Sequence, residues 1–190
     1  VDDSNTLTSI TAWRYWDWGP ANDRDYTGLP IYTKVNNPTK QNQYTQEFRF
    51  SHQDDGFDFV LGVFGFYQEI RTSGIQETGP AASKWLLAPS SALSNNPAVL
   101  NNVVAVNDIQ LDNTSLAAFG KLNWNVTDRF TISPGIRINY DKKEGLYNSV
   151  VTGTASDGTR QIVSPVPGSP SYSDPWTAAQ RGIQASQFFE

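Results

Sequence analysis

The chain has 190 residues, of which 13% are aromatic and 17% charged, with a net charge of −5 and no cysteine. The lack of Cys excludes a disulfide framework and a thiolate metal site, and the acidic balance argues against a broad nucleic-acid interface, which needs clustered Lys and Arg. A disordered chain would be poor in aromatics, so the composition favours an ordered protein. The longest nearly continuous apolar run, residues 59–67, is far shorter than the ~20 residues of a membrane helix.

Five segments show the alternation or the aromatic and β-branched content that is typical of β-strands. In chain order they are residues 6–18, 43–51, 57–70, 116–124 and 130–140. The last segment is the clearest, because Ile136, Ile138 and Tyr140 fall on one face of a strand and Arg137 and Asn139 on the other. Segment 57–70 is apolar on both faces, so the alternation does not say which face points where.

The links between these strands alternate in length. Residues 52–56 and 125–129 have the length and the Asp, Asn or Gly content of hairpin turns, and the single His52 falls in the first of them. The other links are long, and comprise residues 19–40, 71–113 and everything after 141. This alternation indicates an up-and-down sheet with its short turns at one end. Within the long links we expect short helices at 80–88 and 97–104 and an open loop at 153–175.

Strand length favours a membrane barrel over a soluble sandwich. The predicted strands exceed the ~5–6 residues usual in globular proteins. An eleven-residue strand tilted by ~45° rises ~25 Å, the height of the apolar band of an outer-membrane barrel. Aromatic side chains near strand ends, such as Trp18, Trp124 and Phe130, suit the membrane interfaces. We therefore predict an all-β fold: a segment of an antiparallel up-and-down transmembrane β-barrel, with about five to six long strands, short periplasmic turns and long extracellular loops. A sixth strand would begin near Gln187.

Four sequence segments resemble those of one protein family. They are Thr-Gln-Glu-Phe-Arg-Phe-Ser at 45–51, Phe-Asp-Phe-Val-Leu-Gly-Val-Phe at 57–64, Ala-Ala-Phe-Gly-Lys-Leu-Asn-Trp-Asn-Val-Thr-Asp-Arg-Phe at 117–130 and Pro-Gly-Ile-Arg-Ile-Asn-Tyr-Asp-Lys-Lys at 134–143. In their order and spacing they resemble the barrel of TonB-dependent outer-membrane receptors, over roughly residues 5–145. The resemblance implies a plugged barrel of roughly 22 strands that imports scarce nutrients with energy passed on by TonB.

The chain lacks a recognisable TonB box, a plug sequence and a terminal strand ending in an aromatic residue. We therefore expect residues 1–190 to be an internal part of a receptor barrel domain, without the plug and the C-terminal strands. The resemblance implies a place in the outer membrane of a Gram-negative bacterium. The implied partners are outer-membrane lipid, a small-molecule nutrient or siderophore, and the TonB complex through the plug. Neither nucleic acid nor a cofactor is implied.

Two other classes of function compete with transport. A soluble β-sandwich that binds carbohydrate through exposed Trp and Tyr would have shorter strands and turns every 8–12 residues. A barrel enzyme would need a nucleophile and a base, and the single His52 in a predicted turn offers no such pair. We therefore expect no catalysis. An iron–siderophore complex, cobalamin, an oligosaccharide and an aromatic compound all stay open as the transported substrate.

Ligand-binding residues concentrate in loops, and four loop aromatics are candidates for stacking on a ligand: Trp85, Tyr147, Tyr172 and Trp176. Each could equally pack one loop against another. An acidic cluster in the first long link, formed by Asp17, Asp23 and Asp25, could bind a cation, although Arg14 and Arg24 nearby indicate local charge balance. We interpret the charged residues on the polar strand faces as residues that line the barrel lumen without specific ligand contact; they are Glu47, Arg49, Lys121 and Arg137.

Overall fold

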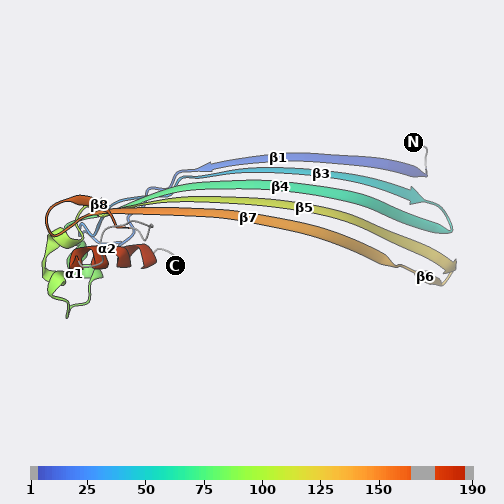
Figure 1. Cartoon of the computed structure of the whole chain (residues 1–190). Helices are drawn as coiled ribbons and strands as arrows, with labels where there is room; N and C mark the ends of the chain where they lie inside the picture. Colours follow the sequence, from blue (N-terminus) through green and yellow to red (C-terminus); the bar gives the residue numbers. More distant parts are fainter. Residues whose placement is uncertain (1–3, 164–173, 187–190) are drawn as a thin grey trace. The chain divides into compact units, whose positions relative to one another are not determined.

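The computed structural model describes residues 4–163 and 174–186, and most of these residues lie in one mostly antiparallel β-sheet (Figure 1). The strand order is β1-β3-β4-β5-β7-β8, with β2 paired to β4 and β6 paired to β5. The described strands do not close into a barrel, since β1 and β8 end the order. The prediction of an all-β, antiparallel fold is confirmed.

The long strands are β1 (Asn5–Trp18), β3 (Thr39–Gln53), β4 (Phe57–Thr78), β5 (Val104–Thr127) and β7 (Gly135–Thr154). Three short strands join them: β2 (Tyr32–Asn36), β6 (Phe130–Ile132) and β8 (Arg160–Ile162). The helical elements are α1 (Ala82–Leu86), the 3-10 turns η1 (Ala92–Asn95) and η2 (Pro97–Val99), and α2 (Pro175–Ser186). Among the described residues, neither α-helix is long and apolar enough to cross a membrane.

The predicted strands are present, but the prediction ended β4 and β7 too early and began β5 too late. Residues 71–78 and 105–113 were expected to be loop and belong to β4 and β5, and β7 runs on from residue 141 to Thr154. These extensions are rich in Asn, Thr, Gln and Asp, so the apolar half of the two-residue alternation fades there. Strand pairing satisfies their backbone groups regardless of the side chains. The pattern that identifies a half-buried strand therefore misses them.

Other local expectations were wrong in detail. His52 lies inside β3 rather than in a turn, where its Nδ1 hydrogen-bonds Asn5 Oδ1 at 2.8 Å and its ring stacks on Phe59. The expected strand 130–140 is interrupted at Pro134, which has no N–H to donate to a neighbouring strand, and continues as β7. Of the helix expected at 97–104 only η2 forms. Helix α2 was not expected, β8 interrupts the loop predicted at 153–175, and the sixth strand near Gln187 lies outside the described residues.

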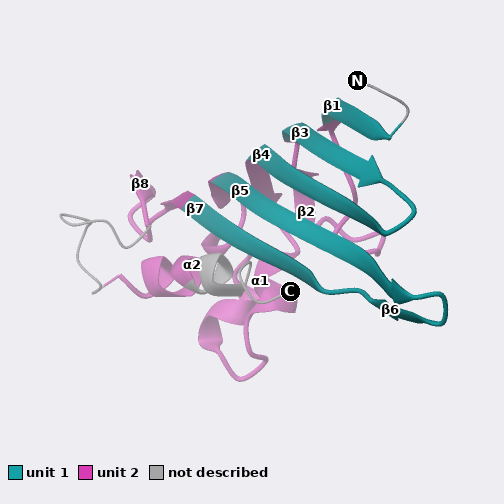
Figure 2. Cartoon of the chain, turned by 90° about the vertical axis from the view of Figure 1, so that its right-hand side faces the viewer, with its two compact units in different colours: residues 1–16, 40–71, 110–145 teal, residues 17–39, 72–109, 146–190 magenta. Residues whose placement is uncertain are grey.

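The chain divides into two compact units, which Figure 2 distinguishes by colour. Unit 1 comprises residues 1–16, 40–71 and 110–145, and unit 2 comprises residues 17–39, 72–109 and 146–190. The strands β1, β3, β4, β5 and β7 contribute residues to both. Every buried hydrophobic residue of the described chain lies in unit 2.

Unit 1 is a single layer of strands with two different faces. On one face Tyr44 stacks on Tyr67 and Phe50 packs against Phe59, and this pairing settles the orientation of β4 that its sequence left open. We call this the apolar face; its members are Leu7, Tyr44, Phe48, Phe50, Phe59, Leu61, Val63, Tyr67, Leu116, Leu122, Ile136 and Ile138, and most of them are exposed. In the described residues no second layer covers this face.

The opposite face of unit 1 carries the charged residues Glu47, Arg49 and Arg137. Arg49 forms an ion pair with Glu47, and the Arg137 guanidinium lies 5.4 Å from the ring centre of Phe119 and 5.9 Å from that of Phe64. The Phe119 ring occupies the space directly above Gly62, so a glycine at that position relieves crowding beside an aromatic ring. We call this the polar face.

Unit 2 has a buried core built from α1, η2, α2, the ends of β5 and β7, and the residue that follows β8. Its buried members are Ala82, Val99, Leu100, Val103, Ala105, Val151 and Val163, with Leu87, Leu93, Trp176 and Ala179 packed around them. The buried Thr78 and Ser83 hydroxyls are hydrogen-bonded to backbone carbonyls, as is usual for buried polar groups. The Ser83 hydroxyl donates to Pro97 O (3.2 Å) and accepts from Leu100 N (3.1 Å), which ties α1 to η2.

Candidate ligand-binding site

Two hollows of about 340 Å³ each lie in unit 2 and share Arg24 and Asn37 as lining residues. The first, here called the loop hollow, is lined by Trp18, Pro20, Asn22, Asp23, Arg24, Tyr26, Val35 and Asn37. The second, here called the strand hollow, is lined by Arg24, Asn37, Thr72, Gly74, Ile75, Gln76, Asn107, Ile109 and Tyr147. A polar hollow bordered by loop residues is the type of place in which ligand-binding side chains are found.

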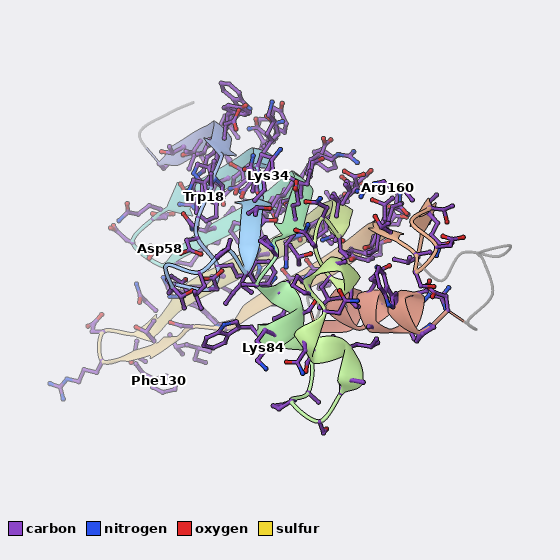
Figure 3. All side chains as sticks on the ribbon, turned by 90° about the vertical axis from the view of Figure 1, so that its left-hand side faces the viewer. Trp18, Lys34, Asp58, Lys84, Phe130 and Arg160 are labelled. Carbon is purple, nitrogen blue, oxygen red and sulfur yellow. The ribbon has the colours of Figure 1, made fainter. Side chains whose placement is uncertain are left out.

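The loop hollow is held in place by the pairing of β2 with β4. Antiparallel pairing sets Val35 opposite Gln76 and Asn36 opposite Ile75, and an isolated bridge joins Ala21 to Asn36. The chain between Trp18 and β2 therefore returns to the sheet as a closed loop. Trp18, which Figure 3 labels, lies where β1 ends and forms one wall of the hollow.

Asp25 fixes the conformation of this loop. Its Oδ1 accepts hydrogen bonds from the Thr27 hydroxyl (2.7 Å) and the Thr27 backbone N–H (3.0 Å), and its Oδ2 accepts from Tyr32 N (3.1 Å). The Thr27 hydroxyl is the main cause of a pKa of Asp25 below its ordinary value, opposed by partial desolvation and aided by the two backbone donors. Tyr26, between these contacts, adopts a left-handed backbone with φ of 54°.

Arg24 lies at the boundary of the two hollows. Its Nη1 donates to Gln76 Oε1 at 2.6 Å, and its guanidinium lies 5.6 Å from the ring centre of Tyr32. Both contacts hold the side chain over the sheet. Arg24 and Asp23 carry opposite charges, so the ionised groups of the two linings sum to zero near neutral pH.

The strand hollow is shaped by a glycine and a tyrosine. The Tyr147 hydroxyl donates to Asn107 Oδ1 at 3.0 Å, which joins β7 to β5. A Cβ on Gly74 would lie only 2.6 Å from Asn37 Oδ1, so the absence of a side chain there lets the Asn37 amide lie over β4. The hollow thus presents amide and phenol groups in addition to Arg24.

The four predicted loop aromatics have different places in the structure. Tyr147 lines the strand hollow, whereas Trp85 is on α1, is 58% exposed and lines neither hollow. Trp176 packs against the core of unit 2, which was the alternative considered for it. Tyr172 lies outside the described residues. Whether any of them contacts a ligand stays a prediction.

The acidic cluster of the first link does not form a shared set of ligands. Asp25 is engaged in its turn, and Asp23 Oδ1 accepts from Asp25 N at 3.1 Å. Within residues 4–163 and 174–186, no group of three or more acidic or His side chains is placed to hold a metal ion. Sequence reasoning did not single out the lining residues Asn22, Tyr26 and Asn37.

A comparison with protein-family models finds no match, and a comparison with curated proteins finds none either. Among solved structures the chain resembles the ferric yersiniabactin uptake receptor FyuA from Yersinia pestis, with a TM-score of 0.55 and 19% sequence identity, covering 85% of this chain. The likeness is one of fold. The chain spans about a fifth of that receptor, since the match covers 21% of its length. The neighbour is a receptor, and its fold agrees with the one that the resemblance to TonB-dependent receptors implies.

Proposed function

We propose that residues 1–190 form part of the barrel domain of a TonB-dependent receptor in the outer membrane of a Gram-negative bacterium. The receptor would take up a scarce nutrient, such as an iron–siderophore complex. The observation that carries the proposal is the one-layer sheet of unit 1, which exposes its apolar face while every buried hydrophobic residue of the described chain lies in unit 2.

The apolar face is a poor surface for contact with water. Leu61, Val63 and Ile138 expose 54%, 53% and 67% of their surface, and they belong to a continuous set that crosses five strands. Monomeric soluble proteins rarely expose contiguous apolar patches of more than a few hundred Å². Lipid covers such a face without a second protein layer, and the alternation of apolar and polar positions is the one that membrane barrels use.

The strand lengths agree with this placement. A tilted membrane strand needs about 9–11 residues, whereas β4 has 22 residues and β5 has 24. The surplus suits strands that continue beyond the membrane and carry loops there. A soluble carbohydrate-binding sandwich, the alternative, would need a second sheet and a core on the apolar face, and the described residues of unit 1 provide neither.

In this proposal unit 2 supplies part of the extracellular capture surface, through the loop and strand hollows. The barrel segment performs no bond chemistry. Contacts with the TonB complex would be made through a plug domain, and the apolar face would contact outer-membrane lipid. Release of the nutrient to the periplasm would then depend on TonB-driven rearrangement of the plug.

Cysteine labelling tests the proposal, because the chain has no native Cys. Ile138→Cys and Asn139→Cys lie on adjacent positions of opposite faces, and Leu116→Cys and Ala117→Cys repeat the pair on β5. The full chain, refolded in lauryldimethylamine oxide micelles, is treated with a charged, water-soluble maleimide. We expect Asn139→Cys and Ala117→Cys to react at least tenfold faster than their neighbours, since detergent shields the apolar face. Equal rates within each pair would contradict the proposal.

A further inference from the structure

We propose that the loop hollow binds a neutral saccharide unit, with a sugar ring against Trp18 and Tyr26 and its hydroxyls hydrogen-bonded by Asn22, Asp23 and Asn37. The role of this unit as part of an imported oligosaccharide rests on the function proposed above. The saccharide class itself follows from the lining of the hollow.

Two large aromatic rings are exposed at one small hollow. Tyr26 is 89% exposed and Trp18 is 50% exposed, although both are large side chains that gain free energy from burial. The left-handed φ of Tyr26 is unfavourable for a residue with a side chain and persists only where its surroundings impose it. The three hydrogen bonds of Asp25 on either side of Tyr26 impose it here. The fold thus holds an aromatic ring in the open rather than burying it.

The polar groups beside these rings include both hydrogen-bond donors and acceptors. The amides of Asn22 and Asn37 each offer donors and an acceptor, and the Asp23 carboxylate offers acceptors. All three side chains are exposed at the hollow. A sugar hydroxyl donates one hydrogen bond and accepts others, so a ring with several hydroxyls matches a lining that mixes both kinds of group. A flat hydrocarbon ligand would leave these groups without partners.

The charges at the loop hollow favour an uncharged ligand. Arg24 lines both hollows and Asp23 lines the loop hollow, where their charges cancel. The Arg24 guanidinium already donates to Gln76 and lies over Tyr32. An anionic ligand, such as a ferric catecholate complex, would meet the Asp23 carboxylate in the lining of the hollow, where the Arg24 guanidinium is already engaged. An uncharged ligand meets no such penalty.

The size of the loop hollow and its border with the strand hollow suit a short oligosaccharide. A hollow of about 340 Å³ is at the small end of ligand pockets, so it suits one part of a ligand rather than a bulky chelate. The strand hollow, of the same volume, borders the same Arg24 and Asn37. A short oligosaccharide could therefore place one unit in the loop hollow and extend toward Tyr147 and Asn107.

The test is binding of neutral trisaccharides to the full chain in detergent micelles, followed by saturation-transfer difference NMR and calorimetry. The probes are maltotriose, mannotriose and N,N′,N″-triacetylchitotriose, with the ferric complex of 2,3-dihydroxybenzoate as the anionic aromatic comparator. We expect saturable binding of at least one trisaccharide. Tyr26→Ala and Trp18→Ala should each weaken it about threefold to tenfold, as for loss of 0.5–1.5 kcal/mol of aromatic contact.

Two variants serve as controls. Tyr26→Phe keeps the ring and should bind like the original chain, and Trp85→Ala removes an exposed aromatic of the same unit that lines neither hollow. Loss of affinity in Trp85→Ala equal to that in Tyr26→Ala would overturn the assignment of the hollow. So would the lack of saturable binding by all three trisaccharides, or Tyr26-dependent binding of the ferric catecholate alone.

The cysteine-labelling and trisaccharide-binding experiments test the receptor proposal and the saccharide site separately. If Ile138→Cys and Asn139→Cys label differently and no trisaccharide binds, the receptor proposal stands and the saccharide inference fails. If a trisaccharide binds and both positions label alike, the saccharide site stands. The chain would then be a carbohydrate-binding domain rather than a barrel segment.

Discussion

Gln180 of α2 occupies the space above Gly153 of β7 that a side chain at position 153 would need. A Cβ on Gly153 would overlap the Gln180 amide, which is itself completely buried. From this position Gln180 Nε2 donates to Val99 O and to Thr154 O, both at 2.8 Å. One side chain thus joins α2 to η2 and β7, and the glycine makes the approach possible.

Gly153→Ala should loosen α2 without unfolding the sheet. Overpacking of a buried site costs typically 1–3 kcal/mol, and the displaced Gln180 would also leave two carbonyls without their donor. We expect trypsin to cleave after Arg181 roughly tenfold faster, since cleavage of a transiently opened segment follows its population. Mass spectrometry of the released peptide measures the rate. Gly28→Ala, where a Cβ has nothing within 4 Å, should be cleaved at the original rate, and equal rates for both variants would contradict the packing.

The pair can also be tested by a double-mutant cycle. Gln180→Ala alone removes the donor to Val99 O and Thr154 O, and an unpaired buried carbonyl costs about 1–3 kcal/mol. The same change makes room for a Cβ at position 153. Gly153→Ala with Gln180→Ala should therefore be no worse than Gln180→Ala alone, measured by the same cleavage rate. Additive effects would show that the two residues do not act through this contact.

The strands of unit 1 follow from their sequence, because each has one face that must avoid water. The alternation in 130–140 identified Ile136 and Ile138 as one face, and the structure places both on the apolar face. The alternation did not identify the strand faces in two segments. In 57–70 both faces are apolar, since Phe64 of the polar face packs under Arg137. In 104–115 neither face is strongly apolar, so no periodicity marks the strand.

The candidate site was far less accessible to sequence reasoning. Its lining comes from residues 18–37, 72–76, 107–109 and 147, which meet only through the register of β2 on β4 and of the long strands. Trp18 was assigned to the membrane interface because it ends a strand rich in Trp. One sequence pattern does point to the site: Trp18 and Tyr26 flank the polar residues Asn22 and Asp23 in a predicted loop.

Protonation of Asp25 should be harder in the folded chain than in the unfolded one. The Thr27 hydroxyl is the main cause of a pKa below the ordinary value of 3.8. A lowered pKa means that this carboxylate contributes stability to the loop above pH 3.8, and that the contribution is lost as the pH falls through the folded pKa. NMR titration of the labelled Asp25 carboxyl carbon measures the value directly.

Thr27→Val tests the cause of that shift. The variant removes the hydroxyl donor and keeps the backbone donors, so the pKa of Asp25 should move back toward 3.8. Thr33→Val is the matched control, because the Thr33 hydroxyl donates to Glu77 O and makes no contact with Asp25. A pKa of 3.8 or higher in the original chain, or an unchanged pKa in Thr27→Val, would refute the assignment.

Gly62 and Gly65 of β4 should respond in opposite ways to the same substitution. A Cβ on Gly62 would overlap the Phe119 ring, which would have to move from beneath Arg137. A Cβ on Gly65 would make an ordinary contact of 3.7 Å with Leu116. Gly62→Ala should therefore lower the free energy of unfolding by about 1–3 kcal/mol. Gly65→Ala should leave it unchanged or raise it by up to about 1 kcal/mol, because alanine restricts the unfolded chain.

Urea unfolding of both variants in detergent micelles, followed by circular dichroism, measures the difference. A further variant separates steric overlap from a general effect of replacing glycine in a strand. Phe119→Leu removes the ring above Gly62, so Gly62→Ala in that background should cost less than in the original chain. If the cost is the same with and without the Phe119 ring, the packing of the polar face around Gly62 is not its cause. If Gly65→Ala is as costly as Gly62→Ala, the two faces of β4 do not differ in the way the structure shows.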